Sequence, residues 1–93
     1  PLSSIDFASE NSLLLFPDPA NGELNVNYLL PHGTTDAVLK VYDARGRICM
    51  QQQLNEDQKT IRLDISGLQE GLFFCTIESG NAVLKNGKFS IVR

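Results

Sequence analysis

Residues 37–54 read AVLKVYDARGRICMQQQL, in which two runs of alternating residues are separated by a short turn. In the first run the apolar residues Ala37, Leu39 and Val41 recur at every second position, as they do on one face of a β-strand. Asp43-Ala44-Arg45-Gly46 has the composition of a tight turn, and a second run follows it. The stretch therefore predicts a β-hairpin.

The same alternation continues on both sides of this hairpin, and no long window shows a helical period. Short runs bounded by glycine, asparagine, aspartate or proline recur about every 8–12 residues, which is the pattern of a β-sandwich. We therefore expect an all-β, immunoglobulin-like antiparallel β-sandwich of about seven strands. Besides the hairpin, the expected strands are 13–16, 23–29, 59–65, 72–78, 82–86 and 88–92, with Gly87 marking a bulge or bend between the last two.

Alternation also predicts which side chains fill the core, because every second residue of a strand faces the same way. The phase of residues 47–54 places Ile48 and Met50 inward and Cys49 outward, whereas Cys75 shares the core face of its own strand. We therefore expect two reduced, unpaired cysteines rather than a disulfide. The expected core consists of Leu24, Val26, Leu39, Val41, Ile48, Ile61, Leu63, Phe73, Ile77, Phe89 and Ile91.

A chain of 93 residues forms one domain with a thin core and has little room for a deep catalytic cleft. Residues 1–46 carry six acids and two bases (net −4) and residues 47–93 five acids and six bases (net +1), so neither half has the basic patch that nucleic acid requires. No run approaches the roughly 20 apolar residues of a membrane span. The chain begins at Pro1 without Met and has no signal-peptide pattern at its start, which indicates a piece of a longer protein. Residues 1–12 suit a linker or edge segment, and 13–93 are expected to form the domain.

No group of residues has the composition of a catalytic or metal site. The one histidine, His32, lies in the loop sequence Pro31-His32-Gly33, so no serine or cysteine has an evident general base. A single histidine and two diverging cysteines do not make up a usual zinc ligand set. The neighbours Glu56 and Asp57, and the acidic stretch 18–23, are better explained as polar turns. We expect no enzyme activity, no metal and no cofactor.

Four short motifs follow one another in the order of a known family. They are LFPDPA (15–20) followed by Leu24-Asn25-Val26, VYDARGR (41–47), IRLDISGLQEGLFF (61–74) and KFSIVR (88–93). Together they resemble the type A C-terminal sorting domains of the type IX (Por) secretion system over residues 13–93. Asp18 stands where that family usually has Asn, and Phe16 where Tyr is common. The residues that match the family motifs are Phe16, Pro17, Asp18, Pro19, Asp43, Gly46 and Gly71.

The resemblance implies that the domain is a secretion and sorting signal of a cargo protein. In the family, components of the type IX translocon recognise the folded domain in the periplasm and pass the cargo through the outer membrane. A sortase-like peptidase then usually removes the domain, although some members keep it. The cargo is attached to anionic lipopolysaccharide, so that it ends at the cell surface or outside the cell. By analogy, cleavage falls within or before residues 1–12. We expect a monomer with no nucleic-acid partner and no membrane span of its own.

The last segment of the chain is the expected recognition site. A strand that reaches the last residue is unusual, because most domains end in a few loosely held polar residues. Phe89 and Ile91 are expected to enter the core, whereas Lys88, Ser90 and Arg93 face outward at a sheet edge. We hypothesise that the translocon reads the six residues Lys88, Phe89, Ser90, Ile91, Val92 and Arg93.

Two other functions fit the same architecture, because fold does not fix function. The first is an immunoglobulin-like accessory or carbohydrate-binding module of a secreted protein, which needs an exposed aromatic platform; Tyr28 and Tyr42 are the outward candidates. The second is a subunit that polymerises by strand exchange, which predicts a sandwich with a missing strand. A small hydrolase is disfavoured because a general base is lacking.

Overall fold

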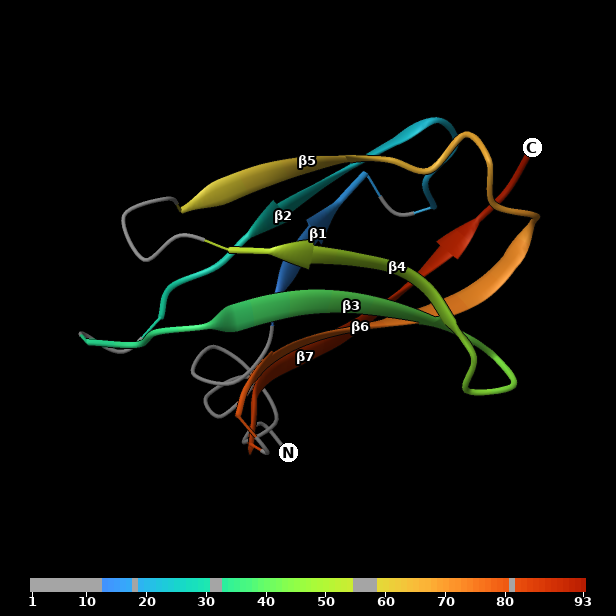
Figure 1. Ribbon diagram of the computed structural model, residues 1–93. Helices are drawn as coiled ribbons and strands as arrows, with labels where there is room; N and C mark the ends of the chain where they lie inside the picture. Colours follow the sequence, from blue (N-terminus) through green and yellow to red (C-terminus); the bar gives the residue numbers. More distant parts are fainter. Residues whose placement is uncertain (1–12, 18, 31–32, 55–58, 81) are drawn as a thin grey trace, which may run out of the picture.

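The computed structural model describes residues 13–17, 19–30, 33–54, 59–80 and 82–93 (Figure 1). Within these ranges seven strands form two antiparallel sheets that pack face to face. The structure therefore confirms the expected immunoglobulin-like sandwich. The strands are β1 (Leu14–Phe16), β2 (Glu23–Asn27), β3 (Ala37–Asp43), β4 (Ile48–Gln53), β5 (Thr60–Asp64), β6 (Gly71–Ser79) and β7 (Ala82–Ile91).

The smaller sheet has the strand order β1–β2–β5 and the larger sheet the order β4–β3–β6–β7. The predicted hairpin is formed by β3 and β4, which pair as antiparallel neighbours. The larger sheet therefore ends in β4 on one side and in β7 on the other, and the smaller sheet ends in β1 and β5 (Figure 1).

Strand β5 shows how the alternation of the sequence fixes the structure. Its residues Ile61 and Leu63 are buried, whereas Thr60, Arg62 and Asp64 are exposed. A slip of one residue in pairing would exchange the two sets and bring both apolar side chains into water. Burial of the alternating residues therefore selects the register as well as the strand.

The core lies between the two sheets and includes the stacked rings of Phe73 and Phe89. Their centroids are 5.6 Å apart, the planes differ by 18°, and the two residues pair directly across β6 and β7. Every side chain expected in the core is buried except Ile48. The buried hydrophobic residues are Leu13, Ala20, Leu24, Val26, Tyr28, Ala37, Leu39, Val41, Leu54, Ile61, Leu63, Ile65, Phe73, Cys75, Ile77, Phe89 and Ile91.

The expectation for Ile48 is wrong, since its side chain is 52% exposed. Val41 pairs with Met50 but Tyr42 pairs with Ile48, so that Cys49 has no residue opposite it and the hairpin contains a β-bulge. The extra residue reverses the alternation and turns Ile48 to the outer face of the sheet, beside Tyr42. Met50, on the other side of the bulge, packs against the core as expected.

The expectation for Gly87 is also wrong. Strand β7 continues through Gly87, which pairs in register with Cys75. The irregularity lies three residues earlier in β7, where Lys85 pairs with Ile77 but Val83 pairs with Glu78, so that Leu84 has no residue opposite it. Glycine serves a different purpose here, because a Cβ at position 87 would lie 3.1 Å from Leu15 Cδ1. The missing side chain lets β1 approach β7 closely.

Both cysteines are free, as expected, but their surroundings differ. Cys49 is exposed at the bulge, whereas Cys75 is buried in β6, and burial raises the pKa of the Cys75 thiol to about 12.

A thiol reagent should therefore distinguish the two cysteines in the native protein. Brief treatment with iodoacetamide near about pH 8 should modify Cys49 alone, because Cys75 is both inaccessible and almost entirely protonated. Peptide mass spectrometry should find one adduct on the native protein and two on the denatured protein. Equal labelling of both cysteines in the native state would contradict the burial of Cys75.

Candidate functional site

Strand β7 contains most of the expected recognition residues and lies at an edge of the larger sheet. Phe89 and Ile91 are each 1% exposed and pair with Phe73 and Gly71 on β6. These two side chains enter the core, as the sequence predicts. They hold the strand in place, so a partner can reach only the residues between and beyond them.

The outer edge of β7 is held at two points by the segment that contains β1. The N–H of Leu13 donates to the carbonyl of Asn86 at 3.0 Å, and the N–H of Ala20 donates to the carbonyl of Ser90 at 2.8 Å. Backbone groups of alternate strand residues face the same side, so the N–H and C=O of Lys88 face this edge between the two points. The side chain of Lys88 is exposed as well.

Arg93 does not present a free positive charge, because its side chain is folded back onto two loops. Its guanidinium donates to the backbone carbonyls of Asn21 at 2.7 Å and Ile65 at 2.8 Å, and also to that of Leu68. Its backbone N–H donates to Glu70 Oε1 at 2.9 Å. Arg93 therefore joins the end of β7 to the loops that enter β2 and leave β5.

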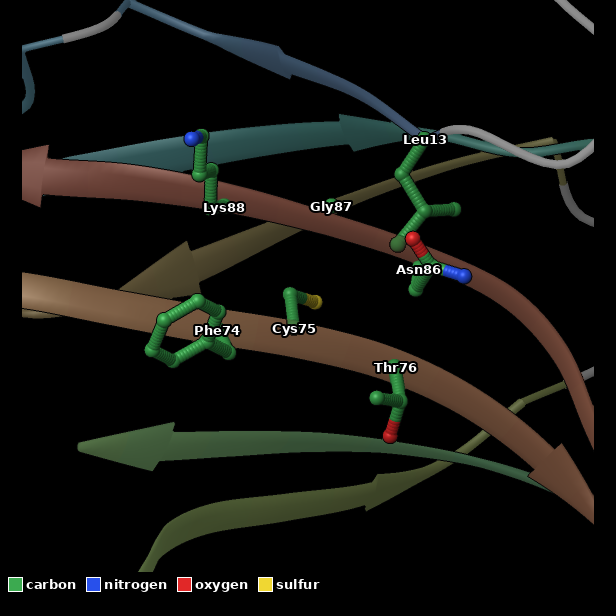
Figure 2. A pocket seen from close by; sticks show the side chains of 7 residues that line it. All are labelled: Leu13, Phe74, Cys75, Thr76, Asn86, Gly87 and Lys88. Atoms are coloured by element: carbon green, nitrogen blue, oxygen red, sulfur yellow. The ribbon is translucent and has the colours of Figure 1, made fainter. Parts of the chain in front are cut away.

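A shallow groove of about 570 Å³ opens along β6 and β7 (Figure 2). Phe74, which is 39% exposed, lies on β6 opposite Lys88 on β7. Leu13 and Asn86 lie together at the other end of the groove. An aromatic ring, an amine and polar side chains are suited to binding rather than to covalent chemistry. The lining residues are Leu13, Phe74, Cys75, Thr76, Asn86, Gly87 and Lys88.

Beside the groove, Glu78 is the centre of a hydrogen-bonded network. It accepts hydrogen bonds from Thr76 Oγ1 and Tyr42 OH, both at 2.8 Å, and Lys40 Nζ lies 3.1 Å from Glu78 Oε1. The bonds from Thr76 and then Tyr42 hold the pKa of the Glu78 carboxyl below its usual value. The bond to Glu78 raises the pKa of Tyr42. The network ties β3 to β6 on the outer face of the sheet.

Three family-motif residues shape the turns beside β3 and β6. The carboxylate of Asp43 accepts hydrogen bonds of 2.9 Å from the backbone N–H groups of Arg47 and Arg45 and from Arg47 Nε. These bonds, with the backbone bond of Arg47 the largest cause, lower the pKa of Asp43. Gly46 has a φ of 87° and Gly71 a φ of 148°, values that side chains with a Cβ disfavour. Their role is to set the geometry of the turns.

The remaining motif residues surround the connection between β1 and β2. Phe16 is 40% exposed, and Pro17 and Pro19 are exposed beyond it, whereas Asp18 lies outside the described residues. The connection delivers Ala20 to the edge of β7, where Ala20 forms an isolated parallel bridge with Ile91. The motif is thus joined to the terminal strand through the backbone.

The described part of the chain contains no cluster of three or more His, Cys, Asp or Glu side chains that could hold a metal ion. His32, Glu56 and Asp57 lie outside it. Cys49 and Cys75 lie on β4 and β6, with β3 between those strands. None of the described segments is a helix of the length and apolarity that a membrane crossing requires.

Several contacts of this site are not evident from the sequence. The acceptors of Arg93 are backbone carbonyls, and the bond from Leu13 to Asn86 joins segments that are distant in the chain. The outward orientation of Phe74 can be predicted from the sequence, because Phe74 follows the core residue Phe73 in the same strand. By contrast Tyr28, an expected outward aromatic, is buried at 6% exposure.

The chain is thus a small immunoglobulin-like sandwich with a bound terminal strand and a shallow groove beside it. The sequence profile described as "Secretion system C-terminal sorting domain" matches residues 14–92, and the chain belongs to this family, that of type IX secretion sorting domains. A solved structure titled "Biofilm associated protein - BSP domain" is similar at 22% identity with a TM-score of 0.69, covering 87% of this chain and 14% of that chain. That likeness concerns the fold alone. No curated protein matches the chain.

Arg93→Ala should lower the free energy of unfolding by about 1–3 kcal/mol, because three backbone carbonyls lose a charged donor. Lys88→Ala, which removes an exposed cation from the same strand, should change it by less than about 0.5 kcal/mol. Urea denaturation of both variants measures the difference. Equal stability of the two would show that the contacts of Arg93 do not stabilise the fold.

Glu78→Gln should destabilise the protein in a pH-dependent manner. Because the folded-state pKa of Glu78 is lowered, its ionised form stabilises the fold above the usual pKa and loses this effect as pH falls through the lowered value. The variant should melt below the parent at about pH 7, and the gap should be smaller at about pH 3. Thermal denaturation at both values provides the measurement, with the exposed Glu23→Gln as the control. An equal gap at both values would contradict a role for the charge.

Proposed function

We propose that this domain is the sorting signal by which a cargo protein is routed through the type IX outer-membrane translocon. Membership of the sorting-domain family over residues 14–92 is the observation that supports the proposal. Export to the cell surface or the extracellular space follows from that membership. Transit through the periplasm, removal by a sortase-like peptidase and attachment of the cargo to anionic lipopolysaccharide are the further steps that we propose.

The anchoring of Leu13 supports cleavage upstream of the sandwich. Leu13 is 7% exposed, and its N–H is bonded to Asn86 on β7. A peptidase needs extended, accessible backbone, which a core residue in a sheet does not offer. We therefore place the cut within or before residues 1–12, which lie outside the described residues; such a cut would leave the sandwich intact. In this proposal the domain is a substrate and contributes no catalytic residue.

Recognition by the translocon is proposed to involve the terminal strand, with a division of roles among its residues. Phe89 and Ile91 act as core anchors and Arg93 as a link to the loops. Lys88 and Val92 remain exposed, and Lys88 adjoins the groove that Phe74 lines. The partner would thus read Lys88 and the groove, with the other residues holding that surface in shape.

The groove also favours a second candidate, a carbohydrate-binding accessory module. An exposed ring such as Phe74 beside the polar side chains of Asn86 and Thr76 is a surface on which a sugar could stack and form hydrogen bonds. Of the two aromatics expected from the sequence, Tyr28 is buried and Tyr42 donates a hydrogen bond to Glu78. The support for this candidate therefore comes from a single ring.

The sorting function predicts that the domain is portable. Residues 1–93 fused behind a signal peptide and a passive reporter should bring the reporter to the surface of a host that has a type IX system. The same fusion with residues 1–12 alone should leave the reporter in the periplasm. Protease accessibility on whole cells distinguishes the two locations. Retention in the periplasm with a folded domain would contradict the proposal and favour the accessory module.

A further inference from the structure

Three of the four sheet edges among the described residues are protected against pairing with another chain. β1 has only three residues and runs into Pro17 and Pro19. β5 exposes the charged side chains Arg62 and Asp64. β7 is covered by hydrogen bonds from the segment around β1. Short length, proline, charge and a covering segment are the means by which proteins protect sheet edges.

Strand β4 has none of these protections. Its six residues, Ile48–Gln53, include no charge and no proline, and five of the six are exposed. β3 pairs with it on one side, and no described strand pairs with it on the other. Among the described strands it is therefore an uncharged strand at the end of the larger sheet, with β3 as its neighbour (Figure 1).

The pairing of β4 with β3 determines which backbone groups face outward. The N–H of Leu54 donates to the carbonyl of Ala37 at 2.8 Å, so residue 54 and, by alternation, Gln52 face β3. The N–H and C=O groups of Gln51 and Gln53 therefore point away from the sheet. These four groups can form the ladder of an added strand.

We propose that the open edge of β4 receives an extended strand from a component of the secretion machinery, which enlarges the four-stranded sheet to five strands. The proposal rests on the sorting function proposed above, which requires a protein partner. Strand addition suits such a partner because main-chain hydrogen bonds give affinity whatever the cargo attached to the domain.

The neighbours of β4 indicate the chemistry of that strand. Ile48 is 52% exposed at the start of β4, so an apolar side chain beside it would be sheltered from water. Arg45 is exposed in the adjoining turn and takes no part in the ion pair between Arg47 and Asp43. The added strand is therefore uncharged along its middle, apolar beside Ile48 and acidic at the end near Arg45.

A second copy of this chain fits the edge less well. Pairing two six-residue strands edge to edge buries little more than the strands themselves, whereas stable protein interfaces bury roughly 1,200–2,000 Å². A larger partner can also cover the outer face of the same sheet, where the register sets Ile48, Tyr42, Phe74 and Lys88 in one row across the four strands.

Substitutions at Gln51 test the edge without disturbing the sheet. Gln51→Pro removes an N–H that points away from β3. Proline is tolerated at such a position of an edge strand. Gln51→Lys keeps the backbone and adds a charge to the edge, and Gln69→Lys makes the same change in an exposed loop. Each is placed in the fusion of signal peptide, reporter and residues 1–93, and the purified domains are melted and examined by sedimentation.

Surface display of the reporter should fall about tenfold for Gln51→Pro and by a smaller factor for Gln51→Lys, with Gln69→Lys unchanged and all melting as the parent does. If Gln51→Pro fails to fold, the surface display of the Gln51→Lys fusion tests the proposal on its own. Display of both Gln51 variants at the level of the parent overturns the proposal. The proposal is also overturned if the parent domain sediments as a dimer and Gln51→Lys makes it a monomer, because the strand paired with β4 then comes from a second copy of this chain. A parent fusion that is not displayed refutes the sorting function itself.

Discussion

The antiparallel pairing of β7 with β6 is the interaction on which the rest of the structure depends. It stacks Phe89 on Phe73 in the core and forms the floor of the groove between Phe74 and Lys88. It also offers the outer edge to which the segment around β1 is bonded. Removing β7 would therefore remove two core side chains, one wall of the groove and the edge to which the segment around β1 is bonded. For a sorting signal this has a consequence: the terminal strand cannot be read as a separate peptide unless the sandwich opens.

Arg93 extends this dependence to the loops. Its guanidinium bonds to backbone carbonyls of two segments that meet at one end of the smaller sheet: Asn21 before β2, and Ile65 and Leu68 after β5. The planar fork of arginine suits such a site, since its several donors keep a fixed geometry, whereas lysine offers a single flexible ammonium. Two cations at the same end of the chain thus have different roles. Arg93 is bonded to the loops, whereas the side chain of Lys88 is exposed.

The sequence predicts the strands well because burial acts residue by residue, and alternating apolar positions such as Ile61 and Leu63 leave a direct record of it. It fails at Ile48, because a bulge inserts one residue without changing composition, and at Gly87, because glycine marks bends and close approaches alike. The contacts of Arg93 could not be predicted at all. Their acceptors are main-chain carbonyls, which every residue carries, so only the assembled fold shows which ones meet. The burial of Phe89 and Ile91 was predictable, whereas the groove depends on pairing between strands.

The two edges of the larger sheet have opposite properties, and the difference bears on function. The chain covers the edge of β7 with its own first segment, so that edge is largely satisfied before any partner arrives. At the outer edge of β4 no described strand pairs with it, and the carboxylate of Asp43 and the left-handed Gly46 fix the hairpin that presents this edge. An edge held in shape in advance spares a partner the entropy of ordering it. The bulge at Cys49 limits the open ladder to the few groups of Gln51 and Gln53, too few to make pairing between copies strong. A preformed but short edge favours a partner that makes further contacts elsewhere on the domain. Such additional contacts would give a sorting signal its selectivity.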